Sequence, residues 1–391
     1  MSVTRSVCSA LWGMCAGDAM AMPVHWFYHV DHIKSQFGSW ISDFKAPKET
    51  HPSSIMSLSN PAGSGRTSSL SPKEPDVIGT IILHNKLHLW RDPSGTVHYH
   101  QGLDAGDNTL NVLVSLRAGL SLVQTGFRDC SSPEARAVVL RDYVDFMTTP
   151  ASHRDSYAES WHRDFFKDWS LDRPTSPEQI LNFAEARSRR KLKSRPDSQL
   201  DAIGCLPMIL PFVLLSASAN QETAVRAAVE MATLTHPHPN ALHTVALYAK
   251  TLHAVVGGAC LREQSEHALK ALGQWETSVR YSKQAQRFPV GSEQRLRVHQ
   301  RAVGELGLAC YSSGALSSLF HLAHEFHDDP VGGILTNTNC GGENCSRGAA
   351  LGALLWASAA RRDQPLPQTW TRAMRDAQDL VPQIVQGLDL D

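Results

Sequence analysis

The sequence predicts an all-α protein built from many helices, and three observations support this fold class. Apolar residues recur at helical spacing along most of the 391 residues, and 42% hydrophobic with 19% charged residues is a globular composition. The clearest strand-like alternation, residues 96–99, is too short to build a sheet. No internal repeat of solenoid length is present. We therefore expect helices packed on helices around a core, without a parallel sheet.

The helices can be assigned in order from their side-chain patterns. Residues 5–22 carry small and apolar side chains nearly all round, which is typical of a buried helix with close neighbours. Residues 108–126 repeat the apolar pattern and end at Gly126, a residue type favoured at helix C-termini. Further helices are expected over residues 133–148, 155–168, 176–188, 200–217, 221–234, 240–258, 262–273, 295–308, 312–326, 346–360 and 366–388.

Two stretches lack helical periodicity. Residues 45–76 are rich in Ser, Pro, Gly and Asn, and a loop of that length is either functional or disordered. Its glycine-punctuated centre contains Arg66, which is compatible with an ordered anion-facing loop and equally with a solvated linker. Residues 187–199 carry a basic run and are expected to form a solvated connection between helices.

The overall composition excludes several classes of partner. The chain has 37 basic and 38 acidic residues, so we expect no nucleic-acid partner and no electrostatic attachment to a membrane. We find no apolar run of membrane-spanning length. The eight cysteines form no CxxC pair, which favours reduced thiols and a cytoplasmic location. The sequence does not indicate an oligomeric state.

Two short polar runs stand directly before apolar helices. Residues 106–109 (Gly-Asp-Asn-Thr) precede one helix, and the run 336–348, with its Gly-Gly pair, leads into the other. Helix N-termini expose free amides, and small side chains let the backbone approach a ligand closely. A buried carboxylate needs a cation or donors around it, so we expect Asp107 and Glu343 to meet in one shared site. Simple helix capping is the alternative for each run.

Histidines and one cysteine add further candidates. His25, His29 and His32 fall at helical spacing, so a zinc site is one interpretation, but no HExxH or Cys/His pattern accompanies them and buried hydrogen-bonding roles are the other. His236 lies in a proline-constrained loop that can aim its ring inward. Cys345 stands at an expected helix start, where a thiolate is stabilised, so a reactive thiol and a buried structural thiol both stay open.

Four segments carry a family resemblance, in the same order along the chain. Residues 13–23 match an opening Gly-Asp-Ala-Leu-Gly helix, residues 106–109 a Thr-Asp-Asp-Thr motif, residues 235–237 a mid-chain Thr-His loop, and residues 342–346 a Gly-Asp-x-Asp-Thr motif. Together they resemble the ADP-ribosylglycohydrolase family, which includes the dinitrogenase-reductase activating glycohydrolase and the jellyfish J crystallins. The resemblance covers nearly the whole length. It implies a single domain over residues 1–391, with the irregular loop at 45–76.

The resemblance implies more than a fold. It implies a compact, orthogonally packed all-α bundle with a two-magnesium site, which binds an ADP-ribosyl group and cleaves the glycosidic bond at the ribose anomeric carbon. In such a site two Mg²⁺ ions orient the ribose hydroxyls and polarise a water molecule.

The motifs also depart from the family pattern at the metal-binding positions. Carried over position by position, the ligands correspond to Gly106, Asp107, Asn108, Glu343, Cys345 and Ser346. Of five family carboxylates only Asp107 and Glu343 remain, because Asn108, Cys345 and His25 stand at the other three acidic positions, His25 seven positions after Asp18. Two carboxylates hold Mg²⁺ less tightly than four, and a thiol is a poor ligand for a hard cation. The resemblance thus implies altered or weakened binding of one Mg²⁺ ion, of two, or of none.

The predicted site residues comprise metal ligands, catalytic residues and substrate contacts. The predicted metal ligands are Asp107, Asn108, Glu343 and Ser346. The predicted catalytic residues are His25, Asp107 and Glu343, with His25 as a general base near neutral pH. The predicted substrate contacts are His236, Asn337, Asn339, Gly341, Gly342 and Asn344.

The sequence thus predicts a hydrolase of an N- or O-glycosidic ribosyl bond, acting on a small-molecule or ADP-ribosylated substrate. The alternative is a catalytically inactive protein of the same fold, either crystallin-like and structural or a binder of ADP-ribose. A thiol-dependent activity at Cys345 is a third hypothesis.

Overall fold

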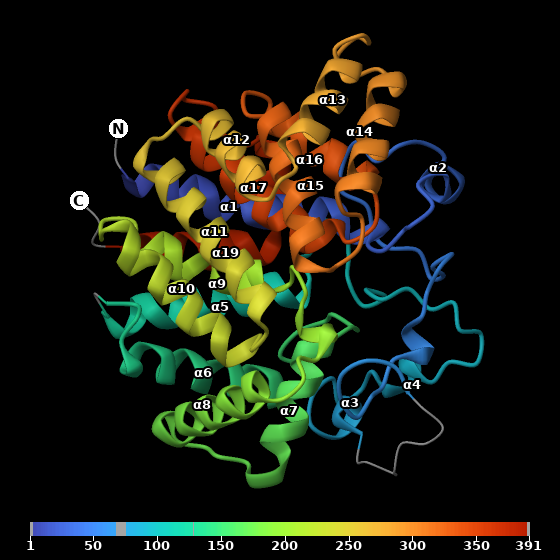
Figure 1. Cartoon of the computed structure of the whole chain (residues 1–391). Helices are drawn as coiled ribbons and strands as arrows, with labels where there is room; N and C mark the ends of the chain where they lie inside the picture. Colours follow the sequence, from blue (N-terminus) through green and yellow to red (C-terminus); the bar gives the residue numbers. More distant parts are fainter. Residues whose placement is uncertain (1–2, 68–75, 128, 389–391) are drawn as a thin grey trace.

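The computed structural model describes residues 3–67, 76–127 and 129–388, and within these ranges every regular element is helical (Figure 1). The all-α prediction is confirmed. The β-type pairing in the described residues is confined to isolated bridges, one of which joins Thr50 to Val97, inside the segment with the weak strand pattern.

The helices follow one another in the order labelled in Figure 1. The long and medium helices are α1 (Val3–Ala21), α5 (Leu110–Thr125), α6 (Pro133–Thr148), α7 (Ser160–Asp172), α8 (Pro177–Lys193), α9 (Cys205–Leu215), α10 (Gln221–Thr235), α11 (Pro239–Gly257), α12 (Leu261–Ala271), α13 (Trp275–Ala285), α14 (Glu293–Leu306), α15 (Ser312–Glu325), α16 (Pro330–Asn339), α17 (Asn344–Ala360) and α19 (Arg375–Gln386). The short ones are α2 (Asp31–Phe37), α3 (Val77–Thr80), α4 (Leu87–Trp90), α18 (Gln368–Ala373) and the 3₁₀ turns η1 (Met22–Val24), η2 (Met56–Leu58) and η3 (Ser198–Leu200).

The structure adds helices that the apolar pattern did not predict, among them α2, α13 and α16. Helix α16 has Pro330 at its first position and is capped by Asp329, whose side chain accepts a hydrogen bond from the amide of Gly332. Its two central glycines and polar C-terminal half hide the helical signal. Part of the polar run 336–348 is therefore the last turn of a helix.

Helices α1 and α17 cross at the centre of the molecule and make its most extensive helix–helix contact (Figure 1). Glycines permit this approach: a Cβ at Gly17 would lie 1.9 Å from the carbonyl oxygen of Gly348, and one at Gly13 would lie 2.2 Å from that of Gly352. Any larger side chain would force the backbones apart. The ends of the sequence thus form the middle of the core.

The first helix and the turn after it correct the expectation that no apolar run reaches membrane-spanning length. Residues Val3–Val24 form a helix that is long and apolar enough to cross a membrane by length and composition, although we found no apolar run of that length. Most of this segment is buried inside the protein. Its packing against α17 explains why its surface is apolar nearly all round.

The described part of the irregular loop, residues 45–67, packs against α7 as ordered structure. Arg163, buried in α7, donates to the carbonyl oxygens of Gly63 and Gly65, and Ser64 donates to Asp197. The remainder of the predicted loop, residues 68–75, lies outside the described residues. The arginine that bonds to the backbone of this loop is Arg163 of α7, which the sequence analysis did not connect with it.

The glycine contact between α1 and α17 gives a stability prediction. Gly17→Ala places a methyl group against the backbone of α17, where no flexible side chain can yield, so the free energy of unfolding should fall by about 3 kcal/mol or more. The matched control is Gly304→Ala in α14, where a Cβ meets no atom within 4 Å. That change should raise stability by about 0.5–1 kcal/mol. Equal midpoints of urea unfolding for the two variants would contradict the argument.

Candidate functional site

Four remote segments meet at the N-terminal end of α17. They are the C-terminal part of α1 with the turn that follows it, the loop before α5, the loop before α7, and the residues 340–346. Their side chains form a buried line of hydrogen bonds, here called the histidine relay, that consists of Glu343, His25, His100 and Asp155.

Glu343 is the N-cap of α17, and its carboxylate is held by three donors. It accepts hydrogen bonds from the amide of Ser346 at 3.2 Å, from Nε1 of Trp26 at 2.7 Å, and from Nε2 of His25 at 3.1 Å. The capping role that the sequence allowed is therefore present together with contacts to the relay. Glu343 and His25 lie together, as the prediction required.

The relay continues from His25 to a second histidine and a second carboxylate. His25 Nδ1 lies 2.7 Å from His100 Nε2, and His100 Nδ1 lies 2.8 Å from an oxygen of Asp155. The other oxygen of Asp155 accepts from the amide of Leu110 at 2.8 Å, at the start of α5. Each imidazole thus has one nitrogen facing a carboxylate and the other facing its neighbour.

The neighbouring groups of the relay shift the pKa values of His100, Asp155 and Glu343 toward their charged forms. Burial raises the pKa of Asp155, but the charge and hydrogen bond of His100, the amide of Leu110 and the charge of His153 together lower that pKa below its usual value. Burial lowers the pKa of His100, and Asp155 reverses this effect and raises it above the ordinary histidine value. Beside His25, the pKa of Glu343 is likewise lowered against the effect of burial. A buried ionic network of this kind needs every member in place.

Asp18 organises the start of α5. Its carboxylate accepts from the backbone amide of Thr109 at 2.7 Å, from the Thr109 hydroxyl at 2.7 Å, and from Nδ2 of Asn108 at 2.9 Å. Burial raises the pKa of Asp18, and these donors oppose that rise. The Gly-Asp motif of the first helix and the polar run before α5 are therefore direct partners.

Asp107 lies elsewhere. Its carboxylate accepts from the amide of Asp104 at 2.7 Å and from the guanidinium of Arg154, so it belongs to the loop before α5 and shares no hydrogen bond with Glu343. Gly106, at φ +88°, turns the backbone at this point. The segments around 107 and 343 do meet, but Asp18 and Asp155 supply the carboxylates there.

The glycine pair before Glu343 sets the position of the relay. Gly341 and Gly342 have φ of +65° and +64°, and a Cβ on either would lie 2.2 Å from a carbonyl oxygen, that of Phe27 or that of Leu308. The amide of Trp26 donates to Gly342, and the amide of Gly342 donates to Phe27. These bonds fix His25 next to Glu343.

Asn337 and Asn344, which were predicted to contact substrate, donate hydrogen bonds to backbone carbonyl oxygens instead. Asn337 donates to the carbonyl of Asn344 and accepts from Arg347, and Asn344 donates to the carbonyls of Val24 and Thr338. None of these asparagines lines the cavity next to the relay. The hydrogen bonds fasten α16 to α17 and to the turn that carries His25.

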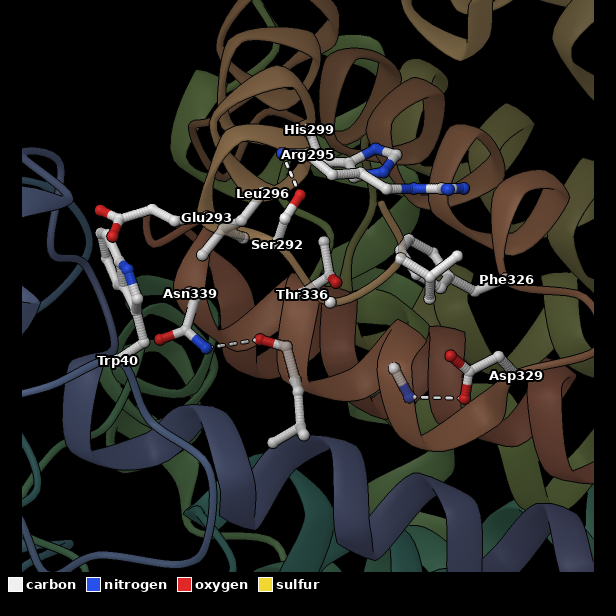
Figure 2. A pocket seen from close by; sticks show the side chains of 14 residues that line it. Trp40, Ser292, Glu293, Arg295, Leu296, His299, Phe326, Asp329, Thr336 and Asn339 are labelled. Atoms are coloured by element: carbon white, nitrogen blue, oxygen red, sulfur yellow. Dashed lines mark hydrogen bonds between the residues drawn. The ribbon is translucent and has the colours of Figure 1, made fainter. Parts of the chain in front are cut away.

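Asn339 lines a different pocket, of about 320 Å³, between α14 and α16 (Figure 2). Figure 2 shows its amide directed to the α16 backbone, where it donates to the carbonyl of Leu335, and it also pairs with both backbone groups of Ile41. Trp40 and Phe326 lie at opposite sides of this pocket in the view. Asn339 is thus separated from the relay by its own helix.

A small cavity adjoins the relay and has room for little more than one water molecule, about 10 Å³. It is lined by His25, His100, Thr109, Leu110, Asn111, Asp155, Tyr157, Glu159, Cys345 and Ser346. Ser346 receives a long hydrogen bond, 3.4 Å, from Nδ2 of Asn111. Of the predicted metal ligands, Ser346 therefore lines the cavity, whereas Asp107 does not.

Glu159, the N-cap of α7, lines this cavity together with Asp155. It accepts a hydrogen bond from Asn111 at 2.8 Å. Burial first, and then the charge of Glu343, raise the pKa of Glu159 to about 8. A protonated carboxyl near neutral pH can donate a proton to a bound group.

Cys345 is a buried thiol on the wall of the same cavity. Burial first, and then the charge of Asp18, raise its pKa well above the ordinary cysteine value. A free thiolate nucleophile is disfavoured in this setting, so the structure favours the structural interpretation of this thiol when nothing is bound. The predicted His25, His29 and His32 set is not assembled, because His29 is exposed while His25 is buried in the relay.

The side chains present do not suit the magnesium ions that the resemblance implies. Mg²⁺ prefers an octahedron of oxygen ligands and several waters. The atoms that face one another beside the cavity are two imidazole nitrogens and a thiol sulfur, and the carboxylates of Asp18, Asp155 and Glu343 are already occupied by N–H and O–H donors. No step through Mg²⁺ follows from this arrangement.

His236 lies one layer behind the cavity. Its ring centroid is 4.5 Å from that of Trp161, which stacks at 3.6 Å on His162, and His162 in turn contacts Asn111. His236 is completely buried, and its Nε2 has no hydrogen-bond partner among the described residues. Burial lowers the pKa of His236 to about 3, so the ring is neutral.

Sequence reasoning missed His100, Asp155 and Glu159. All three lie in loops or caps: the helix expected over residues 155–168 begins only at Ser160, so Asp155 and Glu159 belong to the segment before it. The only available signals were the His98–His100 alternation and the dense charged segment around Arg154. Neither indicates which way a side chain points.

Comparisons with known proteins agree with this fold. A model of the ADP-ribosylglycohydrolase family matches residues 2–390. A solved structure described as an ADP-ribosylglycohydrolase-related protein complex is similar to this chain with a TM-score of 0.52 and 16% identity, over 100% of this chain and 99% of that one. At this identity the likeness shows the fold alone. No curated protein sequence matches the chain.

The buried neutral histidines give a pH prediction. In the unfolded chain His236 titrates near 6.5, whereas its folded pKa is about 3, so the unfolded state takes up a proton first on acidification. This contribution to stability is present above about pH 6.5 and is lost below it, by roughly 1 kcal/mol between pH 7 and 5.5. Urea unfolding at both pH values should show a smaller pH effect for His236→Gln than for the parent protein. Exposed His29→Gln is the control and should keep the parent's pH effect; an unchanged effect in His236→Gln would contradict the assignment.

Proposed function

This chain belongs to the ADP-ribosylglycohydrolase family, and we propose that it hydrolyses an N- or O-glycosidic bond of a ribosyl group. The observation that carries the proposal is the position of Glu159. It lies on a water-sized cavity together with His25 and His100, and its surroundings favour the protonated carboxyl.

Glycosidic hydrolysis needs a proton for the leaving group and an activated water for the anomeric carbon. Glu159 supplies the proton in this proposal, because a buried neutral carboxyl is a stronger donor near neutral pH than an exposed, ionised one. Glu343 cannot share this task, since three N–H donors hold it as an anion. The two glutamates therefore have different roles, which is the usual arrangement in glycosidases.

The histidine relay orients the groups around the cavity. Asp155 fixes the ring of His100, and Glu343 fixes that of His25, so both imidazoles have set directions. The general-base role predicted for His25 fits its place on the cavity wall, and the cavity accommodates the attacking water. The substrate class, a small molecule or a protein that carries ADP-ribose, is taken from the family.

The size of the cavity also favours a second candidate function. About 10 Å³ does not accommodate a nucleotide-sized ligand, so turnover requires the surrounding loops to open. A protein that keeps this site closed would be structural, and one that opens it without cleavage would bind ADP-ribose. The crystallin-like alternative therefore stays a proposal beside hydrolysis.

The experiment measures ADP-ribose released from ADP-ribosyl-arginine and ADP-ribosyl-serine. Glu159→Gln should lower kcat by about 10²–10⁴-fold, because the amide keeps the shape and can accept from Asn111 but has no acidic proton to transfer to a leaving group. The parent protein should lose activity as the pH rises through about 8, the pKa of Glu159, while the residual activity of the variant should lack this loss.

Glu178→Gln, an exposed glutamate in the first turn of α8, is the matched control and should keep full activity. Calorimetric titration with ADP-ribose distinguishes the rival function. Binding by the parent protein without any release of ADP-ribose from either substrate would reject hydrolysis and support the binding protein.

A further inference from the structure

The hydrogen bonds of the histidine relay determine which ring nitrogens of His25 and His100 carry hydrogen, at the site proposed above for hydrolysis. Nε2 of His25 faces the carboxylate of Glu343, and Nδ1 of His100 faces that of Asp155. A carboxylate only accepts hydrogen bonds, so both of these ring nitrogens carry hydrogen. Without a metal, a second proton on His100, as in the charged relay described above, makes its Nε2 a donor to His25 Nδ1 at 2.7 Å. When neither ring carries that proton, these two nitrogens present lone pairs to each other.

Two facing lone pairs at that distance repel, and a cation between or beside them removes the repulsion. The cation is either a shared proton or a metal ion. The surroundings indicate a metal, because a third ligand atom is at hand: Sγ of Cys345 and the two facing nitrogens all lie within 4.8 Å of one another, and all three residues are buried.

The outer contacts match those of protein metal sites. A histidine that binds a metal through one nitrogen usually donates its other N–H to a carboxylate, which fixes the ring and increases its basicity. Here both histidines have such a carboxylate, Glu343 for one and Asp155 for the other. Both carboxylates are in turn held by backbone amides, those of Ser346 and Leu110.

The cavity completes the arrangement. It is lined by all three candidate ligand residues and has space for about one water molecule. Three protein ligands and one water are the usual set of a catalytic zinc site, whereas structural sites are closed by a fourth side chain. Zinc binds imidazole nitrogen at about 2.0–2.1 Å and thiolate sulfur at about 2.3 Å. Ligand atoms around it lie roughly 3.3–3.7 Å apart, so modest side-chain shifts would suffice.

We propose that His25, His100 and Cys345 bind one zinc ion, with a water molecule as the fourth ligand in the cavity that Glu159 lines. Nitrogen and sulfur ligands select zinc over magnesium, which prefers oxygen. On the proposed function, the ion would replace the magnesium centre of the family and would activate the water itself, so that His25 would contribute as a ligand instead of as the general base.

Metal analysis of the full-length protein tests the site without any assay of activity. After incubation with Zn²⁺ and removal of loosely bound metal, we expect one zinc per chain, retained in the presence of excess Mg²⁺. With Co²⁺ in place of zinc, we expect a thiolate-to-cobalt charge-transfer band and the visible bands of a four-coordinate ion.

Variants connect the metal to these residues. Cys345→Ser should abolish the charge-transfer band and reduce the bound zinc, while Cys340→Ser, a buried cysteine at the end of α16, should leave both unchanged. Asp155→Asn should weaken zinc binding by about 10–100-fold while the band stays, because that carboxylate holds only the second nitrogen of a ligand.

A parent protein that holds no stoichiometric zinc, or a cobalt band that persists in Cys345→Ser, would overturn the proposal and leave a shared proton between the histidines. Different results would reject the proposed hydrolysis and the proposed zinc site. Zinc binding without release of ADP-ribose would reject hydrolysis alone, and hydrolysis by a zinc-free protein would reject the zinc site alone.

Discussion

The contact between α1 and α17 is the constraint on which the rest of the structure depends. Gly17 and Gly348 bring the two backbones together, and Asp18 lies one residue beyond the first of these glycines. At the same crossing, Sγ of Cys345 is 3.8 Å from the carbonyl oxygen of Asp18. Because the helices touch through backbone, the polar start of α17 and the polar end of α1 are placed with little freedom, and the loops before α5 and α7 close around them.

The site combines two kinds of polar order. Some side chains, such as Asn337 and Asn344, donate their amide N–H groups to backbone carbonyl oxygens and so stabilise the scaffold. Others, such as Glu159 and Ser346, line the cavity and have few partners. This division explains why Asn337 and Asn344 do not line the cavity beside the relay: their hydrogen bonds hold α16, α17 and the turn before His25 together.

The fold could be predicted from sequence to a large extent, and the site only in part. Long helices such as α5 and α17 are recognisable by runs of small and apolar side chains, and the family resemblance related the motifs at their starts. His25 and Glu343 were found because motif positions mark them. Asp107 was expected at the site because a loop sequence does not state the direction of a carboxylate; in the structure this buried carboxylate bonds to Arg154 and to the amide of Asp104 and not to the relay. His100 and Asp155 have no such marker, since their pairing exists only after two loops have folded together.

The same glycine crossing has a consequence for how the protein is made. Helix α1 finds its main partner in α17, as in the contact between Gly17 and Gly348, so most native pairings of α1 must await synthesis of that distant segment. Until then the apolar surface of α1 stays exposed to solvent. Long-range contacts of this kind slow folding and lengthen the time during which chains can associate wrongly. Biosynthesis of this protein should therefore depend on chaperones that shield its N-terminal segment.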